Sequence, residues 1–158
     1  EAGTLDFSES DFSVNTMLDE IIHAALLKME NEHVQLIVSK GLSECIIRTA
    51  KSRLMQVIIN LVNNAMKFTK KGTITVGYDY LKKENQLKFF VKDTGMGIPK
   101  DKLKDIFGRF VKLNSFAQGS GLGLSICEMI VHTMGGNIWV ESEIEKGTTF
   151  WFTISYTQ

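Results

Sequence analysis

The sequence predicts one α+β domain, and three observations support this fold class. A chain of 158 residues with 44% apolar and 23% charged residues is long enough for one domain with a buried core. Several short segments alternate between apolar and polar residues, as half-buried strands do, and most of them are neighbours in the sequence. Three longer segments place apolar residues at helical spacing. We therefore expect one sheet with helices on one of its faces.

The N-terminal half is predicted to hold two helices and two short strands. Ser13–Thr16 offers N-cap side chains, and the apolar residues of 17–32 then form a single helical stripe. Two short segments, 34–38 and 44–48, follow as strands on either side of a glycine turn. A second amphipathic helix is expected over 52–68.

The C-terminal half is predicted to be built mainly from strand pairs. Thr73–Tyr80 alternates with period two, and Gln86–Lys92 pairs naturally with it across a polar turn. A short helix is expected near 100–106, and an irregular stretch follows it. The last two strands, over 137–143 and 148–156, form a terminal pair.

Composition and charge exclude several classes of function. The chain has 18 basic and 18 acidic residues, so no overall field favours nucleic acid or an anionic membrane. No apolar run approaches the ~20 residues of a membrane-spanning helix. Cys45 and Cys127 lie in apolar surroundings that suit reduced thiols, and three scattered histidines argue against a zinc site. We expect no nucleic-acid partner, no membrane segment in this chain, and a cytoplasmic location, either free or as part of a membrane-anchored receptor.

A glycine-rich segment, Gly119-Ser-Gly121-Leu-Gly123, precedes a third helix expected over 124–134. Unpaired N–H groups and the positive end of the dipole at a helix N-terminus attract anions. Glycines also lack the Cβ atoms that would keep a polyphosphate away from the backbone. The spacing matches neither the Rossmann nor the P-loop pattern. By itself the segment is compatible with a phosphate site or with a flexible turn.

The second predicted helix carries an unusual polar face. A helical projection gathers Asn60, Asn64 and Lys67 on one side and apolar residues on the other. Solvated faces usually consist of Glu and Lys, because asparagine weakens a helix. No acidic residue occurs between Glu44 and Asp79, whereas six basic residues do. This pattern favours an anion lying over the helix, with an asparagine oxygen available to a Mg²⁺ ion that arrives with a nucleotide. An ordinary solvated face is the alternative.

The segment Asp93-Thr-Gly95-Met-Gly97-Ile98-Pro directly follows a predicted strand. A carboxylate at the end of a strand can accept a hydrogen bond from an exocyclic amine, and the two glycines let a flat ring approach the backbone. In isolation, an Asp-initiated turn explains the same residues.

Five motifs occur in order along the chain: Asn60-Leu-Val-Asn-Asn64-Ala-Met-Lys67-Phe68-Thr69, Asp93-Thr-Gly95-Met-Gly97-Ile98-Pro, Phe107-Gly-Arg109-Phe110, Gly119-Ser-Gly121-Leu122-Gly123-Leu124 and Gly147-Thr-Thr149-Phe. This order resembles the catalytic ATP-binding domain of sensor histidine kinases, in the gyrase, chaperone and histidine-kinase ATPase superfamily. The resemblance covers about residues 12–156. It implies a Bergerat-type α/β sandwich, with a mixed, mostly antiparallel sheet of about five strands covered on one face by three helices. Residues 1–13 would be a lead-in from a preceding domain, and residues 14–158 the ATP-binding domain.

The resemblance also implies roles for individual residues. Asn64 would be the Mg²⁺ ligand, Asn60 would lie near metal-bound water and phosphate, and Lys67 would meet the triphosphate. Asp93 would accept from the adenine amino group, and residues about 100–118 would form a lid over ATP. The remaining implied nucleotide contacts are Phe68, Gly95, Gly97, Ile98, Phe107, Phe110, Lys112, Gly119, Gly121, Leu122, Gly123, Leu124 and Thr149.

One departure from the family pattern and one difference from the related ATPases affect the expected activity. The motif around Phe107 has Gly108, Val111 and Lys112 where the family more often has an acid, an aromatic residue and arginine, and Lys112 lacks the bidentate fork of Arg. The helix position that carries a water-activating glutamate in the related ATPases holds Asn60, which is not a base.

The sequence therefore predicts a domain that presents the γ-phosphoryl of Mg-ATP to a histidine elsewhere, without hydrolysing ATP itself. None of the three histidines is followed by an acid, as the family's phosphoacceptor is. The resemblance implies that this histidine lies on a separate dimerisation domain, and that a response regulator receives the phosphoryl group next. The alternatives are a degenerate nucleotide-binding or interaction module and a conformationally coupled ATPase.

Overall fold

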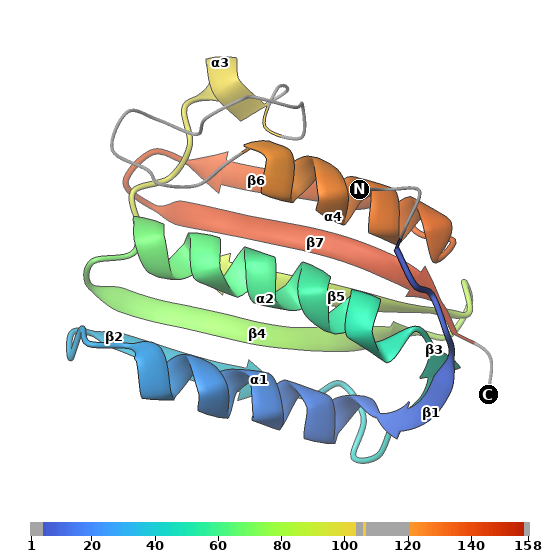
Figure 1. Cartoon of the computed structure of the whole chain (residues 1–158). Helices are drawn as coiled ribbons and strands as arrows, with labels where there is room; N and C mark the ends of the chain where they lie inside the picture. Colours follow the sequence, from blue (N-terminus) through green and yellow to red (C-terminus); the bar gives the residue numbers. More distant parts are fainter. Residues whose placement is uncertain (1–4, 104–105, 107–120, 157–158) are drawn as a thin grey trace.

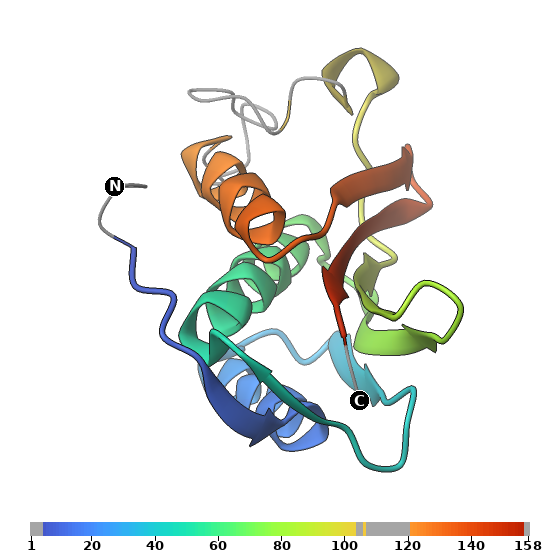
Figure 2. The same ribbon diagram turned by 90° about the vertical axis from the view of Figure 1, so that its right-hand side faces the viewer.

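A computed structural model describes residues 5–103, 106 and 121–156 of the chain. Its elements are β1 (Ser10–Ser13), α1 (Val14–Lys28), β2 (Val34–Ser39), β3 (Ile46–Thr49), α2 (Lys51–Phe68), β4 (Gly72–Leu81), β5 (Gln86–Asp93), α3 (Lys100–Leu103), α4 (Gly121–Thr133), β6 (Ile138–Glu143) and β7 (Gly147–Ser155). Helices α1, α2 and α4 lie side by side on one face of a five-stranded sheet (Figures 1 and 2). The predicted α/β sandwich is confirmed.

The main sheet has the strand order β2-β4-β5-β7-β6. Strands β2 and β4 are parallel, and every other neighbouring pair in this sheet is antiparallel, so the sheet is mixed and mostly antiparallel as predicted. The β4–β5 and β6–β7 hairpins also agree with the sequence prediction. Strands β1 and β3 form a separate antiparallel pair.

The two strands that flank the glycine turn do not pair with each other. Strand β2 joins the main sheet beside β4, whereas β3 pairs with β1. The connection between them is held on α1, because Asn15 Nδ2 donates to the backbone oxygens of Leu42 (2.9 Å) and Ser43 (3.2 Å). The Val14 amide also donates to Cys45 O. These bonds direct the chain away from a local hairpin.

Pairing with β3 also makes β1 part of the packed domain. Phe12, which lies in β1 at the end of the predicted lead-in segment, is only 9% exposed.

The boundaries of two helices differ from the prediction. Helix α1 begins at Val14, where the Ser13 hydroxyl accepts from the Thr16 amide at 3.1 Å, and ends four residues earlier than predicted. Helix α4 begins at Gly121, so the last two glycines of the predicted turn lie in its first turn.

The core lies between the helices and the inner face of the sheet. Alternate residues of β5 and β7 point to the helices, and Phe89 stacks on Phe152 with ring centroids 5.0 Å apart. Helix α2 buries Leu54, Ile58 and Leu61 against this layer. Burial of a side chain of this size contributes roughly 1.5–3 kcal/mol, which is why α2 is fixed along the middle of the sheet.

The opposite face of the sheet, hereafter the open face, carries an aromatic cluster. Phe90, Trp139 and Trp151 lie next to one another there, with the two indoles stacked at 6.4 Å. Lys88 Nζ lies 4.3 Å from the ring centroid of Trp151, and the Trp151 N–H donates to Glu141 Oε1 at 2.7 Å. The cluster therefore has polar partners on its own surface.

Both cysteines are free and buried, as predicted. No helix that the structure describes combines the length and apolar character needed to cross a bilayer.

Tyr78 joins α1, the connection after β2, and β4 within the core. Its hydroxyl donates to Asn15 Oδ1 at 2.6 Å and accepts from the Leu42 amide at 3.3 Å. Replacing Tyr78 by Phe leaves a buried amide oxygen without this donor, so the free energy of unfolding should fall by about 1–3 kcal/mol in a urea titration. An unchanged unfolding midpoint would show that the bond contributes nothing to stability.

The same side chain predicts a pH dependence. Burial, with Cys45 nearby, raises the pKa of Tyr78 from 10.0 to about 12. Its stabilising contribution is complete below the unfolded pKa of 10.0 and is lost as the pH rises through about 12. Wild type should therefore lose more stability than Tyr78→Phe over this alkaline range, measured by parallel thermal unfolding. Equal losses would contradict the prediction.

Candidate functional site

One end of the sandwich gathers most of the described site residues that the sequence singled out. Helices α2 and α4 run in opposite directions, so the C-terminus of α2 and the N-terminus of α4 meet at the end where β5 finishes and β7 starts (Figure 1). Asp93 is the last residue of β5 and pairs across the ladder with Thr148 of β7. This arrangement places a carboxylate, the end of the asparagine helix and a helix N-terminus close together.

Asp93 is a buried carboxylate, 4% exposed, held by backbone amides. Its Oδ1 accepts from the amides of Gly95 (2.9 Å) and Thr148 (3.3 Å), which leaves Oδ2 for another donor. Burial raises the pKa of Asp93, although these two hydrogen bonds and the nearby Thr69 hydroxyl act in the opposite direction. The Thr69 hydroxyl is buried, but it lies outside hydrogen-bond geometry with every described residue. A buried polar pair of this kind suits a ligand that offers a donor.

The two glycines after Asp93 allow this segment to pack against its neighbours. A Cβ atom at Gly95 would lie 2.4 Å from Phe68 O, at the end of α2. Gly97 has φ of 77°, and a Cβ there would lie 2.2 Å from Glu143 O in β6. The glycines thus hold the segment between α2 and the β6–β7 turn, a packing role that the sequence interpretation did not include.

The asparagine face of α2 points toward α4. Asn60 Nδ2 donates to Cys127 Sγ at 3.6 Å, and burial raises the pKa of this thiol to about 11, so the sulfur stays neutral. One turn further along α2, Asn64 is 9% exposed, and no hydrogen bond to its amide is found within the described part of the chain. Because the helices are antiparallel, this step of one turn leads from Cys127 toward Gly123, in the first turn of α4.

The basic residues around α2 divide between its two ends. Arg48 and Lys51 lie at the beginning of the helix and pair with Asp11 (3.4 Å) and Glu20 (3.7 Å). An 18-residue helix is about 27 Å long, so these cations are remote from Asp93. Lys67, in the last turn, is exposed at the Asp93 end. An anion near Asp93 would therefore meet Lys67 but not Arg48 or Lys51.

The other predicted contacts occupy different environments. Phe68, Ile98 and Leu124 are core side chains with 6%, 3% and 1% exposure. Thr149 pairs with Lys92 and Glu141, both exposed, and strand alternation places it on the open face. Gly121, Leu122 and Gly123 form the start of α4. The predicted contacts outside the described residues are Phe107, Phe110, Lys112 and Gly119, with most of the predicted lid.

Three polar residues near Asp93 escaped the sequence analysis: Thr69, Ser142 and Thr148. Thr148 is 4% exposed and shares the inner face with Phe150 and Phe152, so period-two alternation from these two residues would have identified it in place of Thr149. Ser142 belongs to no sequence motif, because its role depends on contacts with a distant segment, and Thr69 ends the asparagine motif without a role assigned to it.

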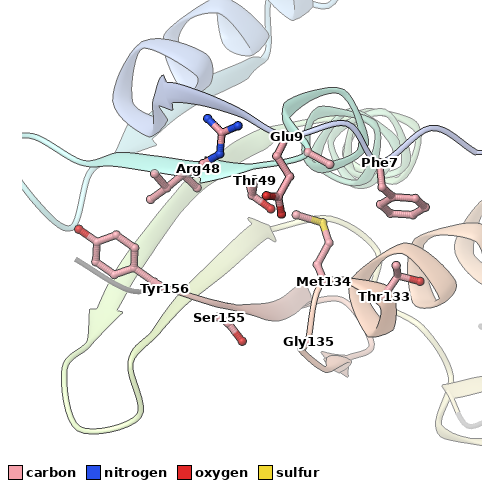
Figure 3. Close-up of a pocket in the computed structure, with 11 residues that line it drawn as sticks. Phe7, Glu9, Arg48, Thr49, Thr133, Met134, Gly135, Ser155 and Tyr156 are labelled. Atoms are coloured by element: carbon pink, nitrogen blue, oxygen red, sulfur yellow. The ribbon is translucent and has the colours of Figure 1, made fainter.

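A cavity of about 560 Å³ lies at the opposite end of the domain. Phe7 and Glu9 of the N-terminal segment face Met134 and Tyr156 across it (Figure 3). None of the described site residues lines this cavity. Its size alone does not make it the functional site, because it lacks the buried carboxylate and the asparagine face described above.

Comparison with known proteins identifies relatives with this architecture. Residues 49–158 match the family model described as histidine kinase-, DNA gyrase B-, and HSP90-like ATPase. The chain is 37% identical to the hybrid signal transduction protein dokA of Dictyostelium discoideum, over 98% of this chain and 10% of dokA. The chain thus spans only a small part of this relative's length.

Two solved structures share the fold over nearly all of the chain. Full-length ShkA in complex with AMPPNP superposes with a TM-score of 0.88 at 25% identity, covering 99% of this chain and 33% of ShkA. The histidine kinase ThkA, in complex with the response regulator protein TrrA, superposes with a TM-score of 0.78 at 27% identity. That match covers 94% of this chain and 42% of ThkA.

Asp93 is expected to lower stability when it is ionised. Because burial raises its pKa above 3.8, the protonated form favours folding below the unfolded value, and this contribution is lost as the pH rises through the folded pKa. Asp93→Asn keeps an oxygen for both amides and should therefore be more stable than wild type at about pH 7, with a smaller difference toward about pH 4. Thermal unfolding at both pH values tests this. The exposed Asp79→Asn provides the control, and a less stable Asp93→Asn at neutral pH would contradict the assignment.

Proposed function

This chain belongs to the family of histidine kinase-, DNA gyrase B- and HSP90-like ATPases, and on that premise we propose that it binds Mg-ATP for phosphoryl transfer to a histidine on a separate domain. The observation that carries the proposal is the buried Asp93 carboxylate, which lies at the same end of the sheet as the end of the asparagine helix and the N-terminus of α4. ShkA, which shares the fold over the whole domain, is described in complex with the ATP analogue AMPPNP.

Recognition of the base would depend on Asp93. Its Oδ1 is already engaged by two amides, so Oδ2 is available to the exocyclic amine of adenine. The neighbouring Thr69 hydroxyl, which has no hydrogen bond among the described residues, adds a second polar group at the same place. A buried charged acceptor favours adenine over a base with a carbonyl oxygen at that position, because two acceptors facing each other leave both unpaired.

The phosphates would lie between α2 and the start of α4. Lys67 offers a cation, and the first-turn amides of α4 offer donors with the positive end of the helix dipole. We place Gly121 and Gly123 in this role because glycine permits close approach to the backbone. This positioning, with charge neutralisation, is the main source of rate in phosphoryl transfer.

Asn64 fits the metal that the family implies. Its amide oxygen is of the type that Mg²⁺ accepts, and the side chain has no other hydrogen-bond partner in the described part of the chain. No group of three His, Cys, Asp or Glu side chains that could hold a metal occurs among the described residues. Mg²⁺ would therefore be held jointly by Asn64, waters and the phosphates, and when bound it would neutralise phosphate charge.

Transfer is favoured over hydrolysis by the composition of α2, which contains no Asp or Glu. Asn60 cannot deprotonate a water molecule, so its amide would instead position groups around the γ-phosphate. The acceptor would be a histidine on a dimerisation domain, and a response regulator would receive the phosphoryl group from it. ThkA, described in complex with a response regulator, supports that partner class. In this proposal residues 14–158 are the ATP-binding domain, and β1 of the predicted lead-in segment packs onto it through β3.

Titration calorimetry with ADP and AMPPNP tests the nucleotide site. Wild type should bind both, and Asp93→Asn should weaken binding by about 1–3 kcal/mol through loss of a charge-assisted hydrogen bond. Asp79→Asn, on the exposed part of β4, should bind as wild type does. Absence of binding by the folded wild type would refute the proposal.

The role of Asn64 is tested by comparing titrations with and without Mg²⁺. Asn64→Ala should lose about tenfold of the affinity measured with Mg²⁺ and little of the affinity measured without it. The exposed neighbour Asn63→Ala is the matched control on the same helix. Equal losses in both conditions would exclude Asn64 as the metal ligand.

Phosphotransfer is tested with γ-phosphate-labelled ATP and the isolated phosphoacceptor domain of a related histidine kinase. Label on the acceptor histidine is the expected result. Nucleotide binding without any transfer, also to acceptor domains from several relatives, would favour the interaction-module alternative.

A further inference from the structure

Ser142 lies at the centre of a hydrogen-bond network beside Asp93. Its hydroxyl oxygen accepts from the Ile98 amide at 2.7 Å, lies 3.0 Å from Gly147 O, and lies 2.7 Å from the Thr148 hydroxyl. These contacts connect β6 to the segment after Asp93 and to the first residues of β7. One short side chain thus contacts two walls of the proposed adenine site.

The directions of these bonds follow from the donors and acceptors available. The Ile98 amide can only donate, and the Gly147 carbonyl can only accept. If the Ser142 proton goes to Gly147 O, the Thr148 hydroxyl donates to Ser142 and all three bonds form together. If the proton goes to Thr148 instead, the bond to Gly147 is lost. The first arrangement has one more hydrogen bond, so the Thr148 proton is directed toward Ser142.

This direction determines what Thr148 presents to a ligand. Thr148 and Asp93 are direct partners in the β5–β7 ladder and lie on the same face of the sheet. With its proton directed at Ser142, the Thr148 oxygen has only lone pairs to offer. The site then presents two acceptors side by side, the Asp93 carboxylate and the Thr148 hydroxyl. Such a pair attracts an amino group and repels a carbonyl oxygen.

We propose that Ser142 is a positioning residue that sets the preference for adenine over guanine nucleotides, by orienting the Thr148 hydroxyl as an acceptor beside Asp93. The inference rests on the proposed function, because it assumes that the base binds at Asp93. Without Ser142, the Thr148 hydroxyl rotates freely and donates to the 6-oxo group of guanine. The same loss removes a partner of the Ile98 amide, which weakens both nucleotides equally and leaves their ratio unchanged.

The test compares ADP and GDP binding by titration calorimetry in the presence of Mg²⁺. Ser142→Ala should lower the ratio of ADP to GDP affinity by about tenfold, the size expected for one redirected hydrogen bond. Ser142→Thr keeps the hydroxyl and should keep the wild-type ratio. Ser39→Ala, an exposed serine on β2, is the matched control and should change neither affinity. Thermal unfolding confirms that each variant is folded.

Thr148→Val gives an independent route to the same result, including the case in which Ser142→Ala does not fold. It removes the oriented hydroxyl, so the ratio should also fall. In the double variant Ser142→Ala/Thr148→Val the ratio should fall no further than in Thr148→Val, because both changes act through one hydroxyl.

Two outcomes would overturn the inference. One is an equal loss of ADP and GDP affinity in Ser142→Ala, which would mean that the serine only supports the structure. The other is an additive fall of the ratio in the double variant. A folded wild type that binds neither nucleotide would refute the proposed function itself, whereas ADP binding with an unchanged ratio in Ser142→Ala would refute only this inference.

Discussion

The buried carboxylate of Asp93 is the constraint on which this end of the molecule depends. A carboxylate withdrawn from water is costly unless donors surround it, and here the donors are the backbone amides of Gly95 and Thr148. Each amide must be brought from a different segment. The tight packing of Gly95 on α2 and of Gly97 on β6 follows from that requirement, because a bulkier chain would not reach.

The same arrangement explains why the polar residues of α2 matter at only one of its ends. Leu54 and Ile58 fix the first half of the helix on the sheet, and at its beginning Arg48 and Lys51 pair with acidic side chains. The second half carries Asn60 and Asn64 against α4, near residues of β5 and β7. The α2 helix thus has ion-paired cations near its beginning and its asparagine face near its end. Strained or unsatisfied groups are expected where a protein binds a ligand.

The sequence predicted most of the architecture, because local patterns specify it. Alternation identified β4, β5 and β7, and helical spacing identified α1, α2 and α4. Asp93 could be predicted as a site residue because a strand pattern, an acid and a glycine are adjacent in the sequence. The parallel placement of β2 could not be predicted, since it depends on hydrogen bonds between Asn15 and the backbone of residues 42 and 43. Ser142 was missed for the same reason: its hydroxyl bonds an amide 44 residues away and two groups of the following strand, and the sequence around it shows no motif.

The aromatic cluster on the open face has an optical consequence. Both tryptophans of the chain, Trp139 and Trp151, are in this cluster, on the face of the sheet opposite to Asp93. Thr148 and Trp151 are three residues apart in β7, about 10 Å along the strand. Intrinsic indole emission therefore monitors the integrity of β6 and β7 from the face of the sheet opposite to Asp93. Loss of the stacked indole pair on unfolding gives this protein an intrinsic fluorescence reporter of the β6–β7 hairpin.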